Sequence, residues 1–155
     1  LIARGFGVIS RLGDGVFWYV LILALALFGG ERGLQAALHM ALLGVVATTL
    51  YHVLKRWTRR PRPFRRHAGI IAHVPPLDEF SFPSGHTLHA VGFTIIALAY
   101  FPLLAPLLLP FAVLVAASRV VLGLHYPSDV IAAALIASVL AGLSLRWVAG
   151  ASLLG

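Results

Sequence analysis

Residues 34–66 read LQAALHMALLGVVATTLYHVLKRWTRRPRPFRR, an apolar run that passes directly into a basic cluster. The run 34–54 is as long as the roughly 20 mainly apolar residues that a helix needs to cross a bilayer. Seven of the chain's twelve Lys and Arg residues lie in the next segment, 55–66. A second polar group, SRVVLGLHYPSD at 118–129, also stands between two apolar runs. The sequence therefore predicts membrane helices whose ends carry clustered polar side chains.

The composition places the whole chain in the membrane. Of its 155 residues, 60% are hydrophobic and 11% are charged, whereas soluble domains carry roughly 25% charged residues. The length suits one compact helical bundle, so we expect residues 1–155 to form a single integral membrane domain. The chain has no cysteine, which excludes thiol catalysis and Cys-ligated zinc.

Five apolar segments predict an all-α bundle of about five transmembrane helices. The segments are 16–28, 34–54, 87–101, 103–117 and 130–148. The first, third and fourth need flanking turns to reach a full crossing. Residues 2–12 carry Arg4 and Arg11 among apolar side chains, which fits either a short amphipathic surface helix or a frayed terminus. Aromatic residues near segment ends are expected to anchor at the membrane interface: Trp18, Tyr19, Trp57, Tyr100, Tyr126 and Trp147.

The order of these segments brings the polar groups to one membrane face. The second predicted helix ends, the third begins, the fourth ends and the fifth begins beside the polar residues of 55–66, 83–86 and 118–129. Because successive membrane helices alternate in direction, all four helix ends emerge on the same side. A single composite site at one membrane face is therefore expected.

The sequence FPSGH at 82–86 predicts an anion site at the start of the third helix. Ser84 is a good N-cap, Gly85 lets the backbone approach a ligand, and the free N–H groups favour an anion. His86 would stand beside that anion, where an imidazolium can protonate a departing oxygen. The alternative is an ordinary capped helix start with an interfacial histidine.

The sequence HYPSD at 125–129 predicts an oriented histidine before the fifth helix. Pro127 fits the first helical turn, so the Asp129 carboxylate can reach back to the His125 imidazole. An Asp that accepts from one ring N–H leaves the other nitrogen free as a nucleophile. The alternative is a helix-capping Asp with a nearby histidine.

Cations flank both of these groups. Arg119 precedes the His125 loop, and Lys55 and Arg62 lie in the other loop. Phosphoryl transfer spreads negative charge over three oxygens and so needs several fixed donors, which these side chains can supply. The other arginines of the basic run are expected to act in positive-inside anchoring or in binding anionic headgroups without catalysis: Arg56, Arg59, Arg60, Arg65 and Arg66.

The carboxylates are too few for a metal centre. The chain has five, of which Asp78, Glu79 and Asp129 are expected near the site, whereas Asp14 and Glu31 are not. A Mg²⁺ or two-metal site wants more oxygen ligands than these. We therefore expect no metal and no other cofactor.

Three motifs carry a family resemblance. Residues 55–63 fit K-x6-R-P, residues 83–86 are P-S-G-H, and residues 118–129 fit S-R-x5-H-x3-D. In this order they resemble the signature of the type 2 phosphatidic acid phosphatase superfamily, which includes lipid phosphate phosphatases, bacterial acid phosphatases and vanadium haloperoxidases. Membrane members commonly show six helices, one more than is counted here, so the resemblance leaves open a further first helix.

The resemblance implies a role for each matching residue. His125 would attack phosphorus and become a phosphohistidine, Asp129 would orient it, and His86 would protonate the leaving oxygen. The family works without a metal. The phosphoryl oxygens would be held by Lys55, Arg62, Ser84, Gly85 and Arg119.

Three functional hypotheses follow. The first is a membrane phosphatase acting on a lipid phosphate or diphosphate, with undecaprenyl diphosphate preferred over phosphatidylglycerol phosphate, phosphatidate or a lipid A phosphate. The second is a phosphatase of a soluble ester, or a vanadate-binding haloperoxidase, on the same fold. The third is a non-catalytic lipid translocator or headgroup binder.

The expected partners are the lipid substrate and the bilayer, with no nucleic acid, and the oligomeric state stays open. The positive-inside rule alone would place the basic loop in the cytoplasm. A phosphate site needs the same cations on either side, however. By resemblance to bacterial members, we expect a protein of the bacterial inner membrane whose site faces the periplasm or exterior.

Overall fold

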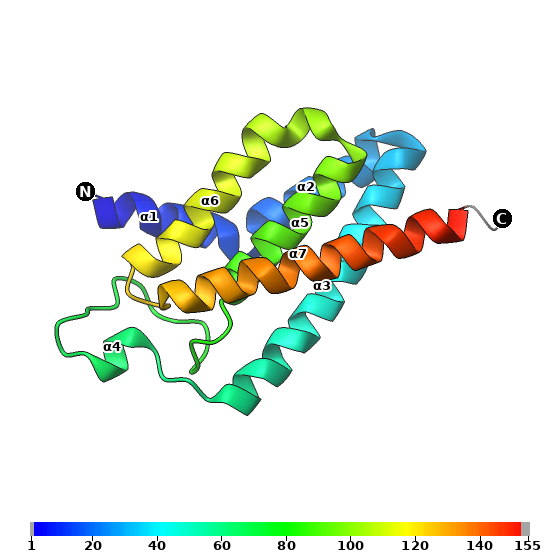
Figure 1. The fold of residues 1–155 in the computed structure, drawn as a ribbon. Coiled ribbons are helices and arrows are strands. Elements are labelled where there is room, and N and C mark those ends of the chain that lie inside the picture. Colours follow the sequence, from blue (N-terminus) through cyan, green and yellow to red (C-terminus); the bar gives the residue numbers. More distant parts are fainter. Residues whose placement is uncertain (1, 153–155) are drawn as a thin grey trace.

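The structure is a computed structural model that describes residues 2–152 and the side chains of residues 5–150. Within that part of the chain all regular elements are helical, and the pairing between Pro61 and Phe80 is an isolated bridge. The all-α class predicted from the sequence is confirmed (Figure 1). The elements are α1 (Ile2–Arg11), the π-helical turn η1 (Leu12–Val16), α2 (Phe17–Phe28), α3 (Gly30–Thr58), α4 (Pro63–Arg66), α5 (Gly85–Tyr100), the 3₁₀ turn η2 (Pro102–Leu104), α6 (Ala105–Val121) and α7 (Pro127–Ser152).

The five predicted apolar segments are all helical. Four stretches of the described chain are long and apolar enough to cross a membrane: Gly5–Phe28, Gly30–Thr58, Pro102–Val121 and Pro127–Gly150. The remaining segment, 87–101, is α5, which has 16 residues and so is about 24 Å long. It packs against α3, α6 and α7 in the middle of the bundle. Much of α5 is buried by other helices, which fits its short length.

The first span is bent at its polar end. α1 packs against α6 and continues through the kinked turn η1 into α2, so residues 2–11 form a helix, as one of the two sequence alternatives expected, and not a frayed end. The side chain of Arg4 lies outside the described residues. Gly15 has a φ of 137°, a conformation that side chains with a Cβ rarely adopt. A Cβ on Gly13 would meet Val115 at 3.0 Å. Glycines on both sides of Asp14 therefore allow the bend and its close contact with α6.

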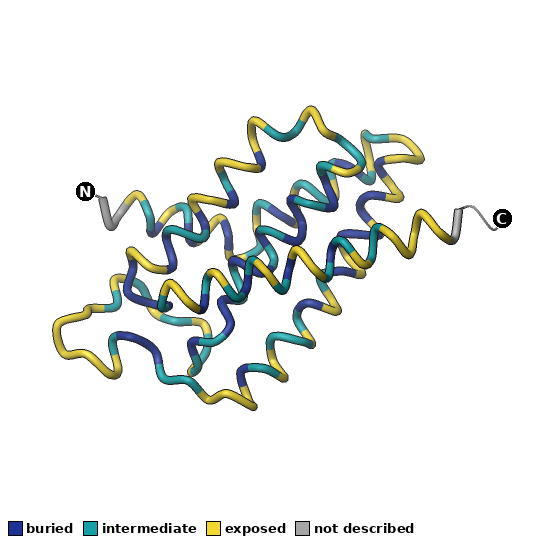
Figure 2. Tube along the Cα trace, viewed as in Figure 1, coloured by how far each residue is buried: buried dark blue, intermediate teal, exposed yellow. Residues whose placement is uncertain are grey.

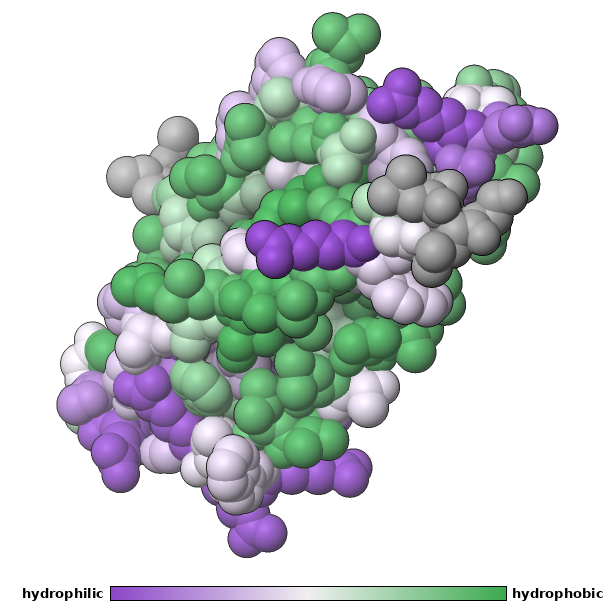
Figure 3. All heavy atoms as spheres, turned by 45° about the vertical axis from the view of Figure 1, so that its right-hand side comes forward, coloured by the Kyte–Doolittle hydropathy of each residue, from purple (hydrophilic) through white to green (hydrophobic). Residues whose placement is uncertain are grey.

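The exterior of the bundle is apolar, as expected for a protein in lipid. Figure 2 shows exposed positions along the outer faces of the long helices, and Figure 3 shows a broad hydrophobic surface with hydrophilic groups gathered mainly at its two ends. The interior is closely packed around Met40, Ile96 and Leu108. Trp18, expected to be an interfacial anchor, is instead 1% exposed and packs against Phe93 and Phe111. It lies in the core because α2 turns that face toward α5 and α6.

The predicted convergence of four helix ends is confirmed. α3 ends, α5 begins, α6 ends and α7 begins at the same end of the molecule, where the segment containing α4 crosses them (Figure 1). Backbone hydrogen bonds tie this segment down: the Ser81 N–H donates to the Arg60 carbonyl at 2.8 Å, the His73 N–H to the Leu122 carbonyl at 3.3 Å, and the Ser84 N–H to the Asp129 carbonyl at 3.3 Å. The three sequence motifs are thereby brought to one end of the bundle.

Candidate active site

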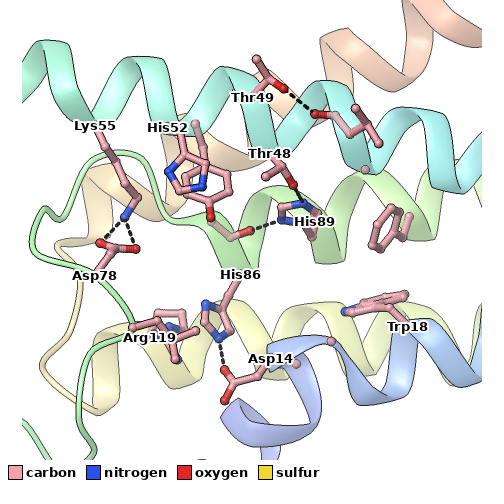
Figure 4. Close-up of a pocket in the computed structure, with 18 of the residues that line it drawn as sticks. Asp14, Trp18, Thr48, Thr49, His52, Lys55, Asp78, His86, His89 and Arg119 are labelled. Carbon is pink, nitrogen blue, oxygen red and sulfur yellow. Dashed lines mark hydrogen bonds and ion pairs between the residues drawn. The ribbon is translucent and has the colours of Figure 1, made fainter.

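A pocket of about 690 Å³ opens between the converging helix ends. Its polar end holds cations and histidines from α3, α5, α6 and the two loops, and its other end runs between α2 and α3 (Figure 4). The predicted site residues that line the pocket are Lys55, Arg62, Gly85, His86, Arg119 and His125. The structure therefore collects six residues from three separate motifs into one cavity.

Ser84 and Asp129 lie behind the pocket wall. Both are 0% exposed. The Ser84 hydroxyl accepts from the Thr87 N–H at 3.4 Å and lies 3.0 Å from the Thr87 hydroxyl, which makes Ser84 the N-cap of α5. The N–H groups of Gly85 and His86 are at the start of this helix, where no carbonyl of the same helix can accept from them. They form the anion-favouring end that the sequence predicted.

The backbone orients the His125 ring. Its Nδ1 lies 2.7 Å from the Ser81 carbonyl oxygen, and because a carbonyl can only accept, Nδ1 carries the proton. The other nitrogen, Nε2, then keeps its lone pair and accepts from Arg62 Nη1 at 3.2 Å. The described geometry thus gives His125 the tautomer that a nucleophile needs.

Asp129 contributes charge and does not hydrogen-bond directly to His125. Its Oδ2 is 3.8 Å from Nδ1, too far for a hydrogen bond, and it accepts from the Tyr126 N–H at 2.9 Å. Oδ1 accepts from Arg60 Nη1 at 2.7 Å. The expected reach from Asp129 to the imidazole is therefore replaced by the Ser81 carbonyl. Arg60, which the sequence assigned to anchoring, is instead the ion-pair partner of Asp129.

Burial keeps His125 neutral. Burial is the largest effect and, with the positive charges of Arg62, Arg119 and Lys55, lowers the pKa of His125 to about 4, while Asp129 opposes this change. The uncharged imidazole is the form with a free lone pair. The His125 ring therefore keeps its free lone pair well below neutral pH.

One carboxylate holds two of the predicted phosphate ligands. Lys55 Nζ donates to both oxygens of Asp78 at 2.7 and 2.9 Å and to the Phe80 carbonyl at 2.9 Å, which uses all three ammonium protons. Arg62 Nη2 donates to Asp78 Oδ1 at 2.8 Å. Burial alone would raise the pKa of Asp78, but these two cations lower it below its usual value. Asp78, which the sequence placed near the site without a role, therefore accepts from the two side chains that the resemblance assigns to phosphate binding.

Arg119 keeps a donor for an anion. It is 2% exposed, and its Nη1 donates to the Ser10 hydroxyl of α1. Its buried Nε has no hydrogen-bond partner among the described residues. Because leaving a buried donor unpaired costs about 1–3 kcal/mol, an oxyanion bound in the pocket would be stabilised there.

The sequence prediction that Asp14 lies away from the site is wrong. Asp14 lines the pocket, and its Oδ1 hydrogen-bonds to His86 Nε2. The bend at η1 places it there, and the GDG sequence at 13–15 is the one signal that could have indicated a special position. Even with Asp14 included, the described residues contain no group of three His, Asp or Glu side chains that could hold a metal ion.

The fold and this site define a polytopic membrane protein that gathers an oriented histidine, a second histidine and buried cations at the polar end of one cavity. The sequence profile of the PAP2 superfamily matches residues 32–152, and the chain belongs to that superfamily.

Several known proteins are similar to this chain in sequence and structure. Undecaprenyl-diphosphatase BcrC of Bacillus subtilis is 28% identical over 132 residues, which cover 85% of this chain and 68% of the relative. Among solved structures, Aquifex aeolicus LpxE matches with a TM-score of 0.81 and 28% identity, covering 94% of this chain and 86% of the other. The transmembrane PAP2 type phosphatidylglycerolphosphate phosphatase from Bacillus subtilis matches with a TM-score of 0.72 and 26% identity, covering 94% and 76%.

We predict that His125 does not take up a proton between pH 8 and pH 5. Since its pKa is lowered to about 4, the folded protein keeps the ring neutral in a range where an ordinary histidine, with a pKa of about 6.5, becomes charged. Imidazole ¹⁵N NMR of the detergent-solubilised protein would measure this. A titration of the His125 resonance centred near pH 6.5 would contradict the prediction.

Proposed function

We propose that this chain is a metal-independent lipid phosphatase that hydrolyses a terminal phosphate through a phosphohistidine intermediate. The observation that carries the proposal is the lone pair of His125 Nε2, fixed inside a cavity that Lys55, Arg62 and Arg119 also line. The phosphatase activities named for BcrC and the phosphatidylglycerolphosphate phosphatase support it.

In the first step, His125 Nε2 attacks phosphorus and a P–N bond forms as the bond to the leaving oxygen breaks. His86 donates a proton to that oxygen, so the product leaves as an alcohol or as a protonated phosphate. The Lys and Arg side chains and the first N–H groups of α5 stabilise the negative charge on the three equatorial oxygens. These donors take the part that a metal ion plays in other phosphatases.

In the second step, water attacks the phosphohistidine. The neutral His86 accepts a proton from this water, the P–N bond breaks, and inorganic phosphate and free His125 are released. His86 ends the cycle protonated, as it began. Each residue therefore returns to its starting state without any cofactor.

A lipid substrate fits the shape of the pocket. Its apolar end is lined by Ile22 of α2 and by Ala41 and Val45 of α3. Tyr19 and Val45 are 72% and 66% exposed on the outer surface, so this end opens sideways to the lipid between α2 and α3. A headgroup can thus reach the cations while its chain stays in the bilayer.

Among lipids, we propose undecaprenyl diphosphate as the preferred substrate, on the similarity to BcrC. Phosphatidylglycerol phosphate, phosphatidate and a lipid A phosphate are the other candidates in the same chemical class. We further propose that the protein resides in a bacterial inner membrane with the site facing the periplasm or exterior.

We predict that His125→Ala lowers phosphate release by at least about a thousandfold, since it removes the nucleophile. The measurement is phosphate release from a panel of lipids by purified protein in detergent with EDTA. His67→Ala, in an exposed part of the loop, is the matched control and should retain activity. Equal activity of the His125 variant, or no hydrolysis of any lipid by the unchanged protein, would overturn the phosphatase assignment in favour of a binder or translocator.

We predict that Asp78→Asn makes inorganic phosphate a stronger inhibitor, with an inhibition constant about tenfold lower. The neutral amide has nearly the same size but no longer competes with phosphate for Lys55 and Arg62. The measurement is competitive inhibition of lipid hydrolysis by phosphate. If phosphate instead inhibits the variant more weakly, Asp78 serves to hold the two cations in place and does not compete with the substrate.

We predict that a cysteine introduced at Gly69 is labelled by an impermeant maleimide from outside intact cells. Gly69 is exposed and lies in the loop over the site, and a Cβ at this position would meet no other atom within 4 Å. The chain has no other cysteine to react. Labelling that needs permeabilised cells would place the site in the cytoplasm.

A further inference from the structure

The proton donor of the site has a carboxylate partner outside the three motifs. Asp14 Oδ1 hydrogen-bonds to Nε2 of His86. A carboxylate only accepts, so Nε2 carries a proton and the second ring nitrogen, Nδ1, is the one left for a substrate. Figure 4 shows that the His86 ring lies between Asp14 and the part of the pocket bordered by Lys55 and Asp78. Asp14 therefore binds the side of His86 that faces away from Lys55.

The surroundings of His86 otherwise work against its protonated form. Arg119 of α6 adds a positive charge, and His89 follows one turn later on α5. His89 uses its own nitrogens for the Gly85 carbonyl at 2.8 Å and the Thr48 hydroxyl at 3.0 Å. Burial of the ring, followed by the charge of Arg119, favours the neutral imidazole, and the contact with Asp14 opposes both. A neutral ring with its proton on Nε2 has none on Nδ1 to give.

The other carboxylates at this end of the molecule are already engaged. Asp78 is held by two cations, Asp129 by Arg60, and Glu79 by Arg65 at 3.2 Å. Within the described part of the chain, Asp14 is the carboxylate that contacts His86. It is thus placed to balance a positive charge on this ring.

The fold holds Asp14 firmly in place. The π-turn, the φ of 137° at Gly15 and the close contact of Gly13 with Val115 set its position. One turn earlier, Ser10 accepts a hydrogen bond from Arg119. The N-terminal segment thus contacts both His86 and Arg119, although the superfamily profile matches only from residue 32.

We propose that Asp14 is a positioning residue that fixes the His86 ring and stabilises its imidazolium form, so that Nδ1–H can protonate the leaving oxygen. This inference rests on the proposed phosphatase function. During the reaction the Nδ1 proton moves to the leaving oxygen and is later replaced by a proton from water. The Nε2–H stays hydrogen-bonded to Asp14, whose charge does not change.

The test compares two soluble phosphate esters that differ in their leaving group. Dodecyl phosphate releases a basic alkoxide that needs a proton, whereas 4-nitrophenyl phosphate releases an acidic phenol that does not. We expect Asp14→Asn to lower kcat for dodecyl phosphate about a hundredfold, in line with the loss of a general acid, and kcat for 4-nitrophenyl phosphate by less than about threefold. Asp14→Glu, which restores the charge, should recover part of the loss.

The pH dependence gives a second readout. Without the Asp14 charge, the His86 imidazolium loses its proton at lower pH. The alkaline limb of the plot of kcat against pH for dodecyl phosphate should therefore move to lower pH in Asp14→Asn. Ser10→Ala is the matched control, because Ser10 contacts Arg119 and not His86. It should affect both esters to the same extent and leave the alkaline limb where it is in the unchanged protein.

The outcomes separate the two proposals. If the unchanged protein hydrolyses neither the esters nor any lipid, the phosphatase function itself fails. If it hydrolyses both esters and Asp14→Asn slows them equally, or slows neither, the role of Asp14 is overturned while the phosphatase function stands. Thermal unfolding of each variant in the same detergent identifies a loss caused by misfolding. In that case Asp14→Glu decides: if this variant folds but does not recover hydrolysis of dodecyl phosphate relative to 4-nitrophenyl phosphate, the role of Asp14 is overturned.

Discussion

Buried positive charge is the constraint on which the site depends. Lys55, Arg62 and Arg119 are each at most 4% exposed, at one end of a bundle whose remaining surface is largely apolar. Removing an ammonium or guanidinium group from water costs several kcal/mol unless a negative partner and hydrogen bonds replace the lost hydration. The partners here are Asp78 and backbone carbonyls for the first two cations, and Ser10 for the third. A phosphate group can take over the same donors.

The rest of the architecture arranges these charges. The loop that follows α3 folds back so that Asp78 reaches the pocket and the Ser81 carbonyl reaches His125. The bent first span brings Asp14 and Ser10 to the opposite side. Because His125 and His86, the proposed nucleophile and proton donor, both contact groups outside their own motifs, the proposed chemistry depends on the loop and the N-terminal segment as much as on the motif residues. The same arrangement leaves a lateral opening between α2 and α3 for a lipid chain.

Parts of the site followed from sequence and parts did not. The motifs led to the six pocket-lining residues and to the N-cap role of Ser84, because each motif is a short segment at a helix end. The sequence predicted that Asp129 orients the His125 ring, but the group that accepts the hydrogen bond from its Nδ1 is the Ser81 backbone carbonyl. Every residue carries such a carbonyl, so no sequence pattern could single out Ser81. Trp18 was misplaced at the interface because a tryptophan near a span end fits both an anchor and a core position.

The sequence by itself determined the membrane class, the five helical segments and the gathering of the motifs on one face. These properties depend on the length of each apolar run and on the alternation of direction between neighbouring spans, both of which are local. Only the tertiary structure decided which charges meet: Asp14 with His86, Asp78 with Lys55 and Arg62, and Arg60 with Asp129. These pairs depend on the bend at Gly15 and on the path of the loop, and a contact between residues far apart in the chain is set by the packing of the whole bundle.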